Sequence, residues 1–272
     1  MRNYILISVL CLVLAGVIAG AYAQPSSPPT IQPLPLPDLE NPAATYDGCL
    51  TLGREKPDRG LEFSGMWLGL GGGEPARHWQ AVALIGLKEY GEAATRLEAL
   101  VEESRESTVV RAGLLAQAGQ AWLLADELER AYAVQTMALA LLPLIDDRRI
   151  EVLIDRAETL AAARNYWEAL DDLNDVIAAD PDNTDALAFR ASAYRYLEAP
   201  ELAMEDANRA LKADPENVGA LLERGNLHQI NSEKMAARQD WLMAIQLAPE
   251  SRAADIARAN IEKLDVKVEV LQ

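Results

Sequence analysis

Small, apolar and polar positions recur with a fixed period along the C-terminal half of the chain. A small residue returns every 34 positions, at Ala169, Ala203 and Ala237. The same period separates the segments 180–183, 214–217 and 248–251, in which a proline is followed by an acid and then by Asn or Ser. Proline ends one helix and Asn or Ser can cap the next, so each period predicts two antiparallel helices.

One such hairpin cannot bury its apolar face alone, so successive hairpins are expected to stack. Small residues would let the two helices of a hairpin approach closely. They recur on the first helix at Ala157, Ala191 and Gly225. Larger residues are expected to fill the remaining space, at Leu160, Tyr194, His228, Leu173, Ala207 and Trp241.

The spacing and type of these residues resemble the pattern of the tetratricopeptide repeat family. That family has a period of 34 residues, small residues at repeat positions 8, 20 and 27, and Pro at position 32. The repeat that starts at Thr184 matches at Ala191, Ala203, Ala210 and Pro215, and the repeat that starts at Val218 matches at Gly225, Ala237, Ala244 and Pro249. The resemblance implies an all-α fold, an α-solenoid of about five helix hairpins.

We divide the solenoid, residues 74–264, into five repeats and a C-terminal capping helix. The repeats are 74–111, 112–149, 150–183, 184–217 and 218–251, the first two with a longer period of 38, and the cap is 252–264. Residues 46–73 are predicted to form an N-terminal helical cap in which Leu61, Met66 and Trp67 dock on the first repeat. In the tail, 265–272, valines alternate with charged residues, which predicts a frayed, strand-like end.

The N-terminal region predicts export. Arg2 precedes an apolar run, and Ala21-Tyr22-Ala23 has the form of a signal-peptidase site, so residues 1–23 are interpreted as a signal peptide. An uncleaved anchor is the alternative, because the run is nearly long enough to span a membrane. Residues 24–45 are proline-rich and predict an extended linker. The expected location is the periplasm, or the inner membrane facing the periplasm.

Cleavage after Ala23 would remove Cys11 and leave Cys49 as the only cysteine. The exported chain could then form no internal disulfide. Cys49 is interpreted as a small, half-buried apolar residue, with an intermolecular disulfide as the alternative.

The charge of the chain excludes some partners. Lys and Arg total 25 against 42 Asp and Glu, a formal net charge of -17. Nucleic acid and anionic membrane surfaces both require a basic protein surface, so neither is an expected ligand. A hydrophobic content of 50% with only 6% aromatic residues fits a core built from Ala and Leu.

The sequence offers little support for catalysis. His78 and His228 have no second His or Glu at metal-ligand spacing, and His228 lies in a column of packing residues. Glycines at 69–73 are followed by Glu74 rather than Lys and Ser, which argues against a phosphate site. No nucleophile motif is present, so we expect no enzyme activity, no metal and no cofactor.

Arg and Asp recur in the same columns of the last three repeats. The pairs are Arg156 with Asp172, Arg190 with Asp206, and Arg224 with Asp240. A catalytic site would occur once, so repetition predicts structural ion pairs between the two helices of each hairpin.

The resemblance also implies a concave groove lined by the first helix of each repeat. In the family, a Lys/Asn/Arg clamp on this face binds acidic C-termini, but its position 5 is occupied here by Ile154, Ala188 and Leu222, so that ligand class is not expected. Gln117 and Gln120 would lie on the same concave face, in the second repeat. The predicted partner-binding residues are Glu151, Asp155, Glu158, Asp185, Phe189, Ser192, Arg195, Tyr196, Glu223, Asn226 and Gln229.

These residues favour a non-enzymatic protein-protein interaction scaffold of the bacterial cell envelope. Its partner would be a basic or neutral protein or peptide segment held in the acidic groove, with Phe189 and Tyr196 as apolar anchors. Each acidic residue could instead belong to a solvated helix face. A membrane-tethered structural spacer, or an accessory subunit of an envelope enzyme complex, is the alternative function.

Overall fold

The computed structural model describes residues 55–269 continuously and, before them, the separate residues Leu34, Pro37, Asp38, Asn41, Thr45 and Leu52. The chain divides into two units, Met1–Leu34 and Pro35–Gln272. The first unit holds the predicted signal peptide or anchor, and only Leu34 of it is described. Cys11 and Cys49 also lie outside the described residues, so the predictions made for them remain predictions.

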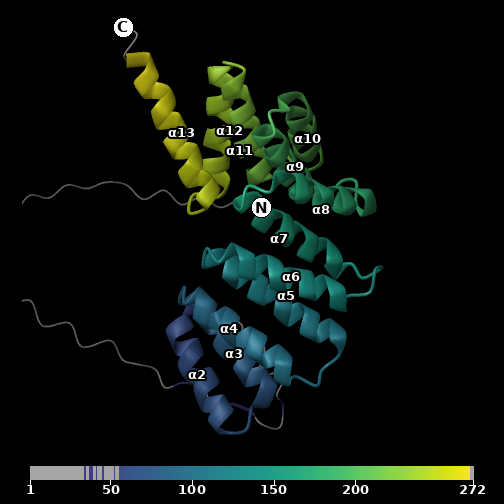
Figure 1. The fold of residues 1–272 in the computed structure, drawn as a ribbon. Coiled ribbons are helices and arrows are strands. Elements are labelled where there is room, and N and C mark those ends of the chain that lie inside the picture. Colours follow the sequence, from purple (N-terminus) through teal and green to yellow (C-terminus); the bar gives the residue numbers. More distant parts are fainter. Residues whose placement is uncertain are drawn as a thin grey trace, which may run out of the picture. The chain divides into compact units, whose positions relative to one another are not determined.

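All regular structure among the described residues of the second unit is helical (Figure 1). Helices α3 to α12 form five antiparallel hairpins, which we number 1 to 5 in chain order, and α2 and α13 flank them. The helices are α2 (Pro57–Gly69), α3 (Gly73–Gly86), α4 (Tyr90–Glu103), α5 (Thr108–Leu124), α6 (Leu128–Leu141), α7 (Arg148–Ala162), α8 (Tyr166–Ala179), α9 (Thr184–Tyr196), α10 (Pro200–Ala213), α11 (Val218–Ile230), α12 (Lys234–Leu247) and α13 (Arg252–Glu269).

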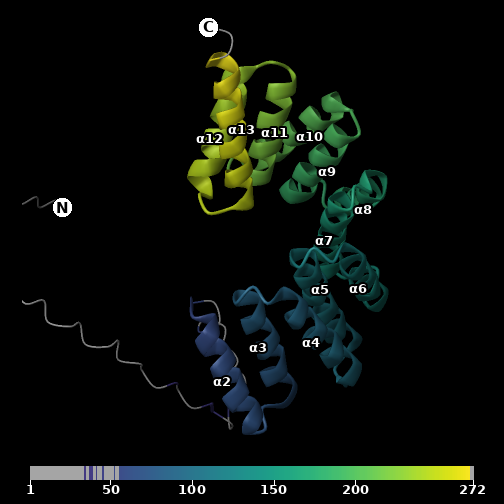
Figure 2. The same cartoon turned by 60° about the vertical axis from the view of Figure 1, so that its left-hand side comes forward.

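The hairpins stack in chain order, as Figures 1 and 2 show by their colour gradient. Each helix packs on the next one along the chain, and first helices also contact the first helix of the following hairpin: α5 with α7, α7 with α9 and α9 with α11. The last first helix, α11, contacts α13 in the same way. The predicted all-α solenoid of helix hairpins with a C-terminal capping helix is therefore confirmed.

The turn inside each hairpin has the same backbone in all five cases. A residue with positive φ follows the first helix, at Lys88, Asp126, Arg164, Glu198 and Ser232. The next amide then donates to a carbonyl near the helix end, as Asn165 N does to Leu160 O at 2.8 Å. This pattern closes a helix and usually employs glycine. Hairpins 1 and 2, whose sequences match the repeat pattern less well, thus fold like the other three.

The predicted helix caps are present. The side chains of Asn183 and Asn217 accept hydrogen bonds from the amides of Ala186 and Ala220, at 3.0 and 2.8 Å. Ser251 accepts in the same way at the start of α13. Each cap satisfies one of the amides that a helix leaves unpaired at its start.

The small residues of the first helices are required by their neighbours. A Cβ atom on Gly225 would lie 2.5 Å from Nε1 of Trp241, which is fully buried on α12. A Cβ atom on Gly119 would lie 2.5 Å from Cγ of Gln135 on α6. In hairpin 3 the same two positions hold Ala157 and Leu173, both buried. Glycine thus occurs where the partner on the second helix is a larger or longer side chain.

The repeated Arg and Asp residues form ion pairs, as predicted. Each arginine binds both carboxylate oxygens of its aspartate, as Arg190 does for Asp206 through Nε and a terminal guanidinium nitrogen at 2.7 and 2.9 Å. All three aspartates are buried. The pairs therefore link the two helices of hairpins 3, 4 and 5 from inside the packed region.

Several boundaries differ from those predicted. The final helix continues to Glu269, past the expected end at Leu264, so residues 265–269 are helical where alternating valines suggested a frayed strand. Helix α5 begins at Thr108 rather than near Ala112, because Ser107 caps it there. The four extra residues at the end of the first repeat, 108–111, thus lengthen the first helix of the second.

The two N-terminal segments also depart in part from the predictions. Trp67 of α2 is buried as expected, but the other large buried residue of this helix is Phe63, while Leu61 and Met66 are only half-buried. In the predicted linker, Pro37 and Thr45 are buried, so its end belongs to the folded unit. In the described part of the chain, no helix has the length and apolarity needed to cross a membrane.

Candidate functional site

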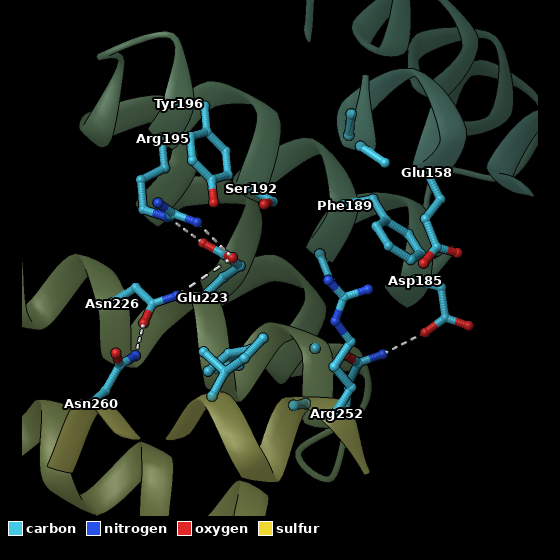
Figure 3. A pocket seen from close by; sticks show the side chains of 18 of the residues that line it. Glu158, Asp185, Phe189, Ser192, Arg195, Tyr196, Glu223, Asn226, Arg252 and Asn260 are labelled. Atoms are coloured by element: carbon cyan, nitrogen blue, oxygen red, sulfur yellow. Dashed lines mark hydrogen bonds and ion pairs between the residues drawn. The ribbon is translucent and has the colours of Figure 1, made fainter. Parts of the chain in front are cut away.

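A pocket of about 810 Å³ lies against the first helices of hairpins 3, 4 and 5 and against α13 (Figure 3). Helices α7, α9 and α11 form one wall, and the start of α13 forms another. Its lining residues are Glu158, Ala161, Ala162, Asp185, Ala188, Phe189, Ser192, Arg195, Tyr196, Asn217, Gly219, Leu222, Glu223, Asn226, Gln229, Ile230, Arg252, Ala253, Ile256 and Asn260.

The pocket brings together most of the residues that the sequence suggested for partner binding. Those that line it are Glu158, Asp185, Phe189, Ser192, Arg195, Tyr196, Glu223, Asn226 and Gln229. Glu151 and Asp155 do not line it. They lie nearer the start of α7, where Gln120 of α5 donates a 2.8 Å hydrogen bond to the Asp155 carboxylate.

Sequence reasoning missed the wall formed by α13. This helix contributes Arg252, Ala253, Ile256 and Asn260 to the pocket. The Ile256 side chain is 40% exposed and lines the pocket. The period does extend into this helix, where Arg258, Ala259 and Asn260 follow Arg224, Gly225 and Asn226 by 34 residues, so the wall was missed because α13 was interpreted only as a cap.

A polar network fixes one side of the pocket. Arg195 of α9 binds both carboxylate oxygens of Glu223 on α11, at 2.6 and 3.0 Å. Asn226 donates to Glu223 at 3.5 Å and accepts a 2.9 Å hydrogen bond from Asn260 of α13. Figure 3 shows this chain of contacts running across the three helices.

The network changes the charge expected for the groove. Burial alone would lower the pKa of Arg195, but hydrogen bonds to Glu223 and its charge hold that pKa above its ordinary value. Glu223 is buried and neutralised by this pair, so it offers no free negative charge to a partner. This side of the pocket is thus polar and carries both charges.

The opposite side of the pocket holds charges that are more open. Asp185 accepts a 2.8 Å hydrogen bond from Asn217, whose side-chain oxygen caps α11. Arg252 is exposed and extends from α13 into the pocket (Figure 3). Desolvation by the groove wall raises the pKa of Glu158, and the charge of Arg252 opposes that rise in part.

The aromatic residues of the pocket differ in their surroundings. Tyr196 stacks on Tyr166 of the preceding hairpin, with ring centres 4.7 Å apart and planes within 5°. The Arg195 guanidinium covers the Tyr196 ring at 4.2 Å. Phe189 packs against the main apolar core at the pocket floor. Tyr196 is therefore held in place before any partner binds.

The acidic group on α7 has a distinct electrostatic character. Burial raises the pKa of Asp155 to about 6, with further contributions from the charges of Glu158 and Glu151, and the hydrogen bond from Gln120 opposes the rise. This carboxyl therefore ionises close to neutral pH.

Both histidines are held by neighbouring side chains. His78 lies 2.7 Å from the Gln117 amide oxygen, and burial lowers its pKa. His228 contacts Glu233 and lies 3.8 Å from Asp240, as expected for a packed residue. Across the described residues, no cluster of three or more His, Cys, Asp or Glu side chains could hold a metal ion.

Comparison with known proteins gives the fold. No protein-family model matches the chain, and no curated protein matches it significantly. MamA from Desulfovibrio magneticus RS-1 is similar in structure, with a TM-score of 0.52 and 20% identity over 66% of this chain and 97% of that chain.

Two further solved structures are similar at the same level. YrrB, described as a tetratricopeptide repeat protein with an unusual peptide-binding site, has a TM-score of 0.52 and 20% identity over 68% of this chain and 90% of its own. A tetratricopeptide repeat protein from Parabacteroides merdae has a TM-score of 0.54 and 19% identity over 71% and 74%. Together with the hairpins and their repeated positions, these similarities show that the chain has the tetratricopeptide repeat fold.

Proposed function

We propose that the chain is a non-enzymatic scaffold of the bacterial cell envelope that binds a segment of another protein in the pocket between α7, α9, α11 and α13. The observation that carries the proposal is the pocket itself, about 810 Å³ with an apolar floor and a prearranged polar wall. Its volume is within the usual range of ligand sites. Because Arg195, Glu223, Asn226 and Asn260 are already linked, they would need little reordering when a partner binds.

The lining chemistry supports an extended peptide as the ligand. A peptide backbone presents both donors and acceptors, and side-chain amides such as Asn226 and Gln229 can pair with either. Phe189, Leu222 and Ile256 offer apolar contacts for alternate side chains of such a segment. YrrB, whose fold is similar, is described as having a peptide-binding site.

The charges refine the partner that we propose. The segment inside the pocket would be neutral, because Arg195 neutralises Glu223 and the positive charge of Arg252 offsets part of the negative charge of Glu158 and Asp185. Glu158 lines the pocket, and Asp155 and Glu151 continue the acidic stretch along α7 beyond it. A basic residue next to the bound segment would be favoured there. The partner is thus neutral in its centre and basic at one end.

The envelope location rests on the sequence of residues 1–23, and fractionation of cells tests it. We expect the chain in the periplasmic extract, shortened to begin at Gln24, or in the inner membrane if the segment is retained. A full-length chain in the cytosolic fraction would contradict this location. The binding proposal would survive that result, because it depends only on the pocket.

Site-directed crosslinking in cells tests the pocket. A photoreactive phenylalanine analogue replacing Ser192 lies in the pocket, whereas one replacing Lys212 on α10 is exposed elsewhere. We expect a discrete crosslinked product from the first position and not from the second. Ile256→Asp should abolish this product, while Met137→Asp, at an exposed site on α6, should not.

Circular dichroism of both variants controls for folding. A product that persists in Ile256→Asp would show that the pocket does not hold the partner. Replacing Glu151, Asp155 and Glu158 with Lys should weaken the association and reduce its sensitivity to salt. Indifference to those changes would remove the acidic stretch of α7 from the binding site.

A further inference from the structure

The edge of the solenoid where each first helix ends and each second helix begins carries exposed apolar side chains. We call this the turn edge. Leu124, Tyr196 and Ile230 end the first helices of hairpins 2, 4 and 5. Trp167, Leu202 and Met235 lie at the starts of the second helices of hairpins 3, 4 and 5. All six side chains are exposed.

Stacking of the hairpins brings equivalent residues to one edge: Leu124, Tyr196 and Ile230 share one repeat position, Trp167 and Met235 share another, and Leu202 lies one position later. First helices contact one another in sequence from α5 to α13, so their ends lie along the same edge. The stacked rings of Tyr166 and Tyr196 show directly that the turn of one hairpin touches the turn of the next. Neighbouring helices pack about 8 to 10 Å apart, so the row along hairpins 2 to 5 is about 30 Å long. A helix of about 20 residues has this length.

The most exposed members lie outside the pocket. Trp167 is 68% exposed and Met235 is 80% exposed, and neither lines the pocket of the proposed function. Large apolar side chains gathered on one surface are characteristic of an interaction site, whereas isolated ones are ordinary. Tryptophan and methionine are also enriched at protein interfaces.

The charges around the row select the kind of partner. The turns and adjoining helix starts at 125–129, 163–168, 197–202 and 231–235 contain mostly acidic charged residues: Asp126, Glu127, Glu129, Glu168, Glu198, Glu201 and Glu233, against Arg164 and Lys234. These side chains are exposed. A second copy of this chain would present the same carboxylates, and an anionic membrane surface would be repelled by them.

We propose that the turn edge is a second docking surface, which binds a basic amphipathic helix of a partner protein. The apolar face of that helix would cover Trp167, Leu202 and Met235, and its Lys and Arg side chains would lie beside the flanking carboxylates. This is the geometry by which a helix lies on a hydrophobic surface through residues spaced by three and four. Trp167, Leu202 and Met235 lie outside the pocket, whereas Tyr196 and Ile230 belong to both surfaces. The scaffold would hold this helix next to the segment in the pocket.

Tryptophan quenching gives a direct test. The chain has five tryptophans. Trp67, Trp79, Trp122 and Trp241 are at most 3% exposed, so acrylamide quenching of the purified chain reports mainly on Trp167. The probe is a synthetic 18-residue peptide with Leu on one helical face and Lys elsewhere. We expect it to reduce quenching of Trp167, and expect the same peptide with Glu in place of Lys to have no effect.

Variants locate the binding, measured by fluorescence anisotropy of the labelled Lys peptide. The double variant Trp167→Ser, Met235→Ser should bind at least tenfold more weakly. Met137→Ser, an exposed residue of α6, and Ile256→Asp in the pocket should bind within about twofold of the unmodified chain. Replacing Glu168, Glu198 and Glu201 with Gln should lower the salt dependence of binding.

Three results would overturn the proposal outright, and a fourth would relocate the peptide. The three are equal loss of binding in Met137→Ser and the double variant, equal binding of the Glu peptide, and shielding of Trp167 that rises with the concentration of the chain alone. The last result would assign the edge to self-association. Loss of binding only in Ile256→Asp would move the peptide to the pocket, and would leave the proposed function standing.

Discussion

Hairpins 1 and 2 reach the same hairpin backbone as hairpins 3, 4 and 5 with different side chains at one pair of positions. In the last three hairpins these positions hold Arg156 with Asp172, Arg190 with Asp206, and Arg224 with Asp240. Hairpin 2 has the apolar pair Ala118 and Val134, both buried. Hairpin 1 has Gln80 and Arg96, joined by a 3.2 Å hydrogen bond at the surface.

This difference shows that the hairpin does not require the ion pair. The turn geometry is the same in all five hairpins, so it is set by the helix lengths and the small packing residues. A buried ion pair must recover the cost of removing two charges from water, and an apolar pair of suitable size can be as stable. The ion pairs therefore make hairpins 3 to 5 sensitive to the loss of one partner, without making them intrinsically more stable.

The largest expected effect comes from breaking one ion pair. Asp206→Ala should lower the free energy of unfolding by about 3 kcal/mol, because it leaves the half-buried Arg190 without its carboxylate. The double change Arg190→Ala, Asp206→Val copies the residues of hairpin 2. It should cost less than about 1 kcal/mol, which urea denaturation followed by circular dichroism would measure.

Arg96→Ala in hairpin 1 is the matched control. Arg96 bonds only through exposed contacts, to Glu92 and Gln80, so its loss should change stability by about 0.5 kcal/mol or less. If the double variant of hairpin 4 were as unstable as Asp206→Ala, the apolar pair of hairpin 2 could not replace the ion pair of hairpin 4. The comparison would then fail.

The next effect concerns the glycine of hairpin 5. Gly225→Ala should destabilise the protein by about 2 kcal/mol, because the new methyl group would collide with the rigid, buried Trp241. Adding Trp241→Leu recreates the Ala and Leu combination of hairpin 3. Thermal unfolding of the unmodified chain, the two single variants and the double variant should show that the double variant loses less stability than the sum of the single variants. Additive losses would mean that Trp241 can move aside.

A smaller effect of opposite sign is expected in hairpin 2. Gln135 is fully buried, and neither its amide nitrogen nor its amide oxygen has a hydrogen-bond partner. The equivalent positions of hairpins 1 and 3 hold Leu97 and Leu173. Gln135→Leu should therefore raise the free energy of unfolding by about 1.5 kcal/mol, since it removes the desolvation cost of an unpaired amide.

Leu173→Gln is the converse variant, and it should lower stability by a larger amount. Chemical denaturation of both variants measures the two changes in the free energy of unfolding. A loss of stability in Gln135→Leu would indicate that the amide is satisfied in solution, for example by an enclosed water molecule.

The repeats made the fold predictable, because the same small residues, prolines and caps recur at one spacing. The period also predicted the ion pairs, since Arg and Asp recur together. It could not predict the turn residues, because Asp126 and Glu198 adopt a backbone conformation that usually favours glycine. The turn is imposed by packing of the two helices, which a local sequence preference does not record.

The site was predicted where residues were assigned to repeats and was missed in the helix that was assigned as a cap. Phe189, Tyr196 and Asn226 were found because they share repeat positions on first helices. Arg252 and Asn260 were missed because α13 was interpreted only as a cap, although Asn260 lies one period of 34 residues after Asn226. The neutralisation of Glu223 was also missed, because it depends on Arg195 of a neighbouring helix rather than on any spacing within one repeat.

The smallest expected effect lies at the junction between the two sets of hairpins. There Asp155 of α7 accepts a hydrogen bond from Gln120 of α5, and burial raises its pKa from 3.8 to about 6. A raised carboxyl pKa means that folding favours the protonated form. The stabilising contribution is complete below pH 3.8 and is lost as the pH rises through about 6.

Asp155→Asn should therefore match the unmodified chain in stability at pH 4 and exceed it by about 1 kcal/mol at pH 7.5, after allowance for partial exposure of the carboxyl. Unfolding by urea at a series of pH values gives the difference curve, whose rise should centre between pH 4 and 6. Asp182→Asn, at an exposed site, should differ by less than about 0.5 kcal/mol throughout. A flat difference curve for Asp155→Asn would mean that water reaches this carboxyl freely, and that the junction between hairpins 2 and 3 is more open than its hydrogen bond implies.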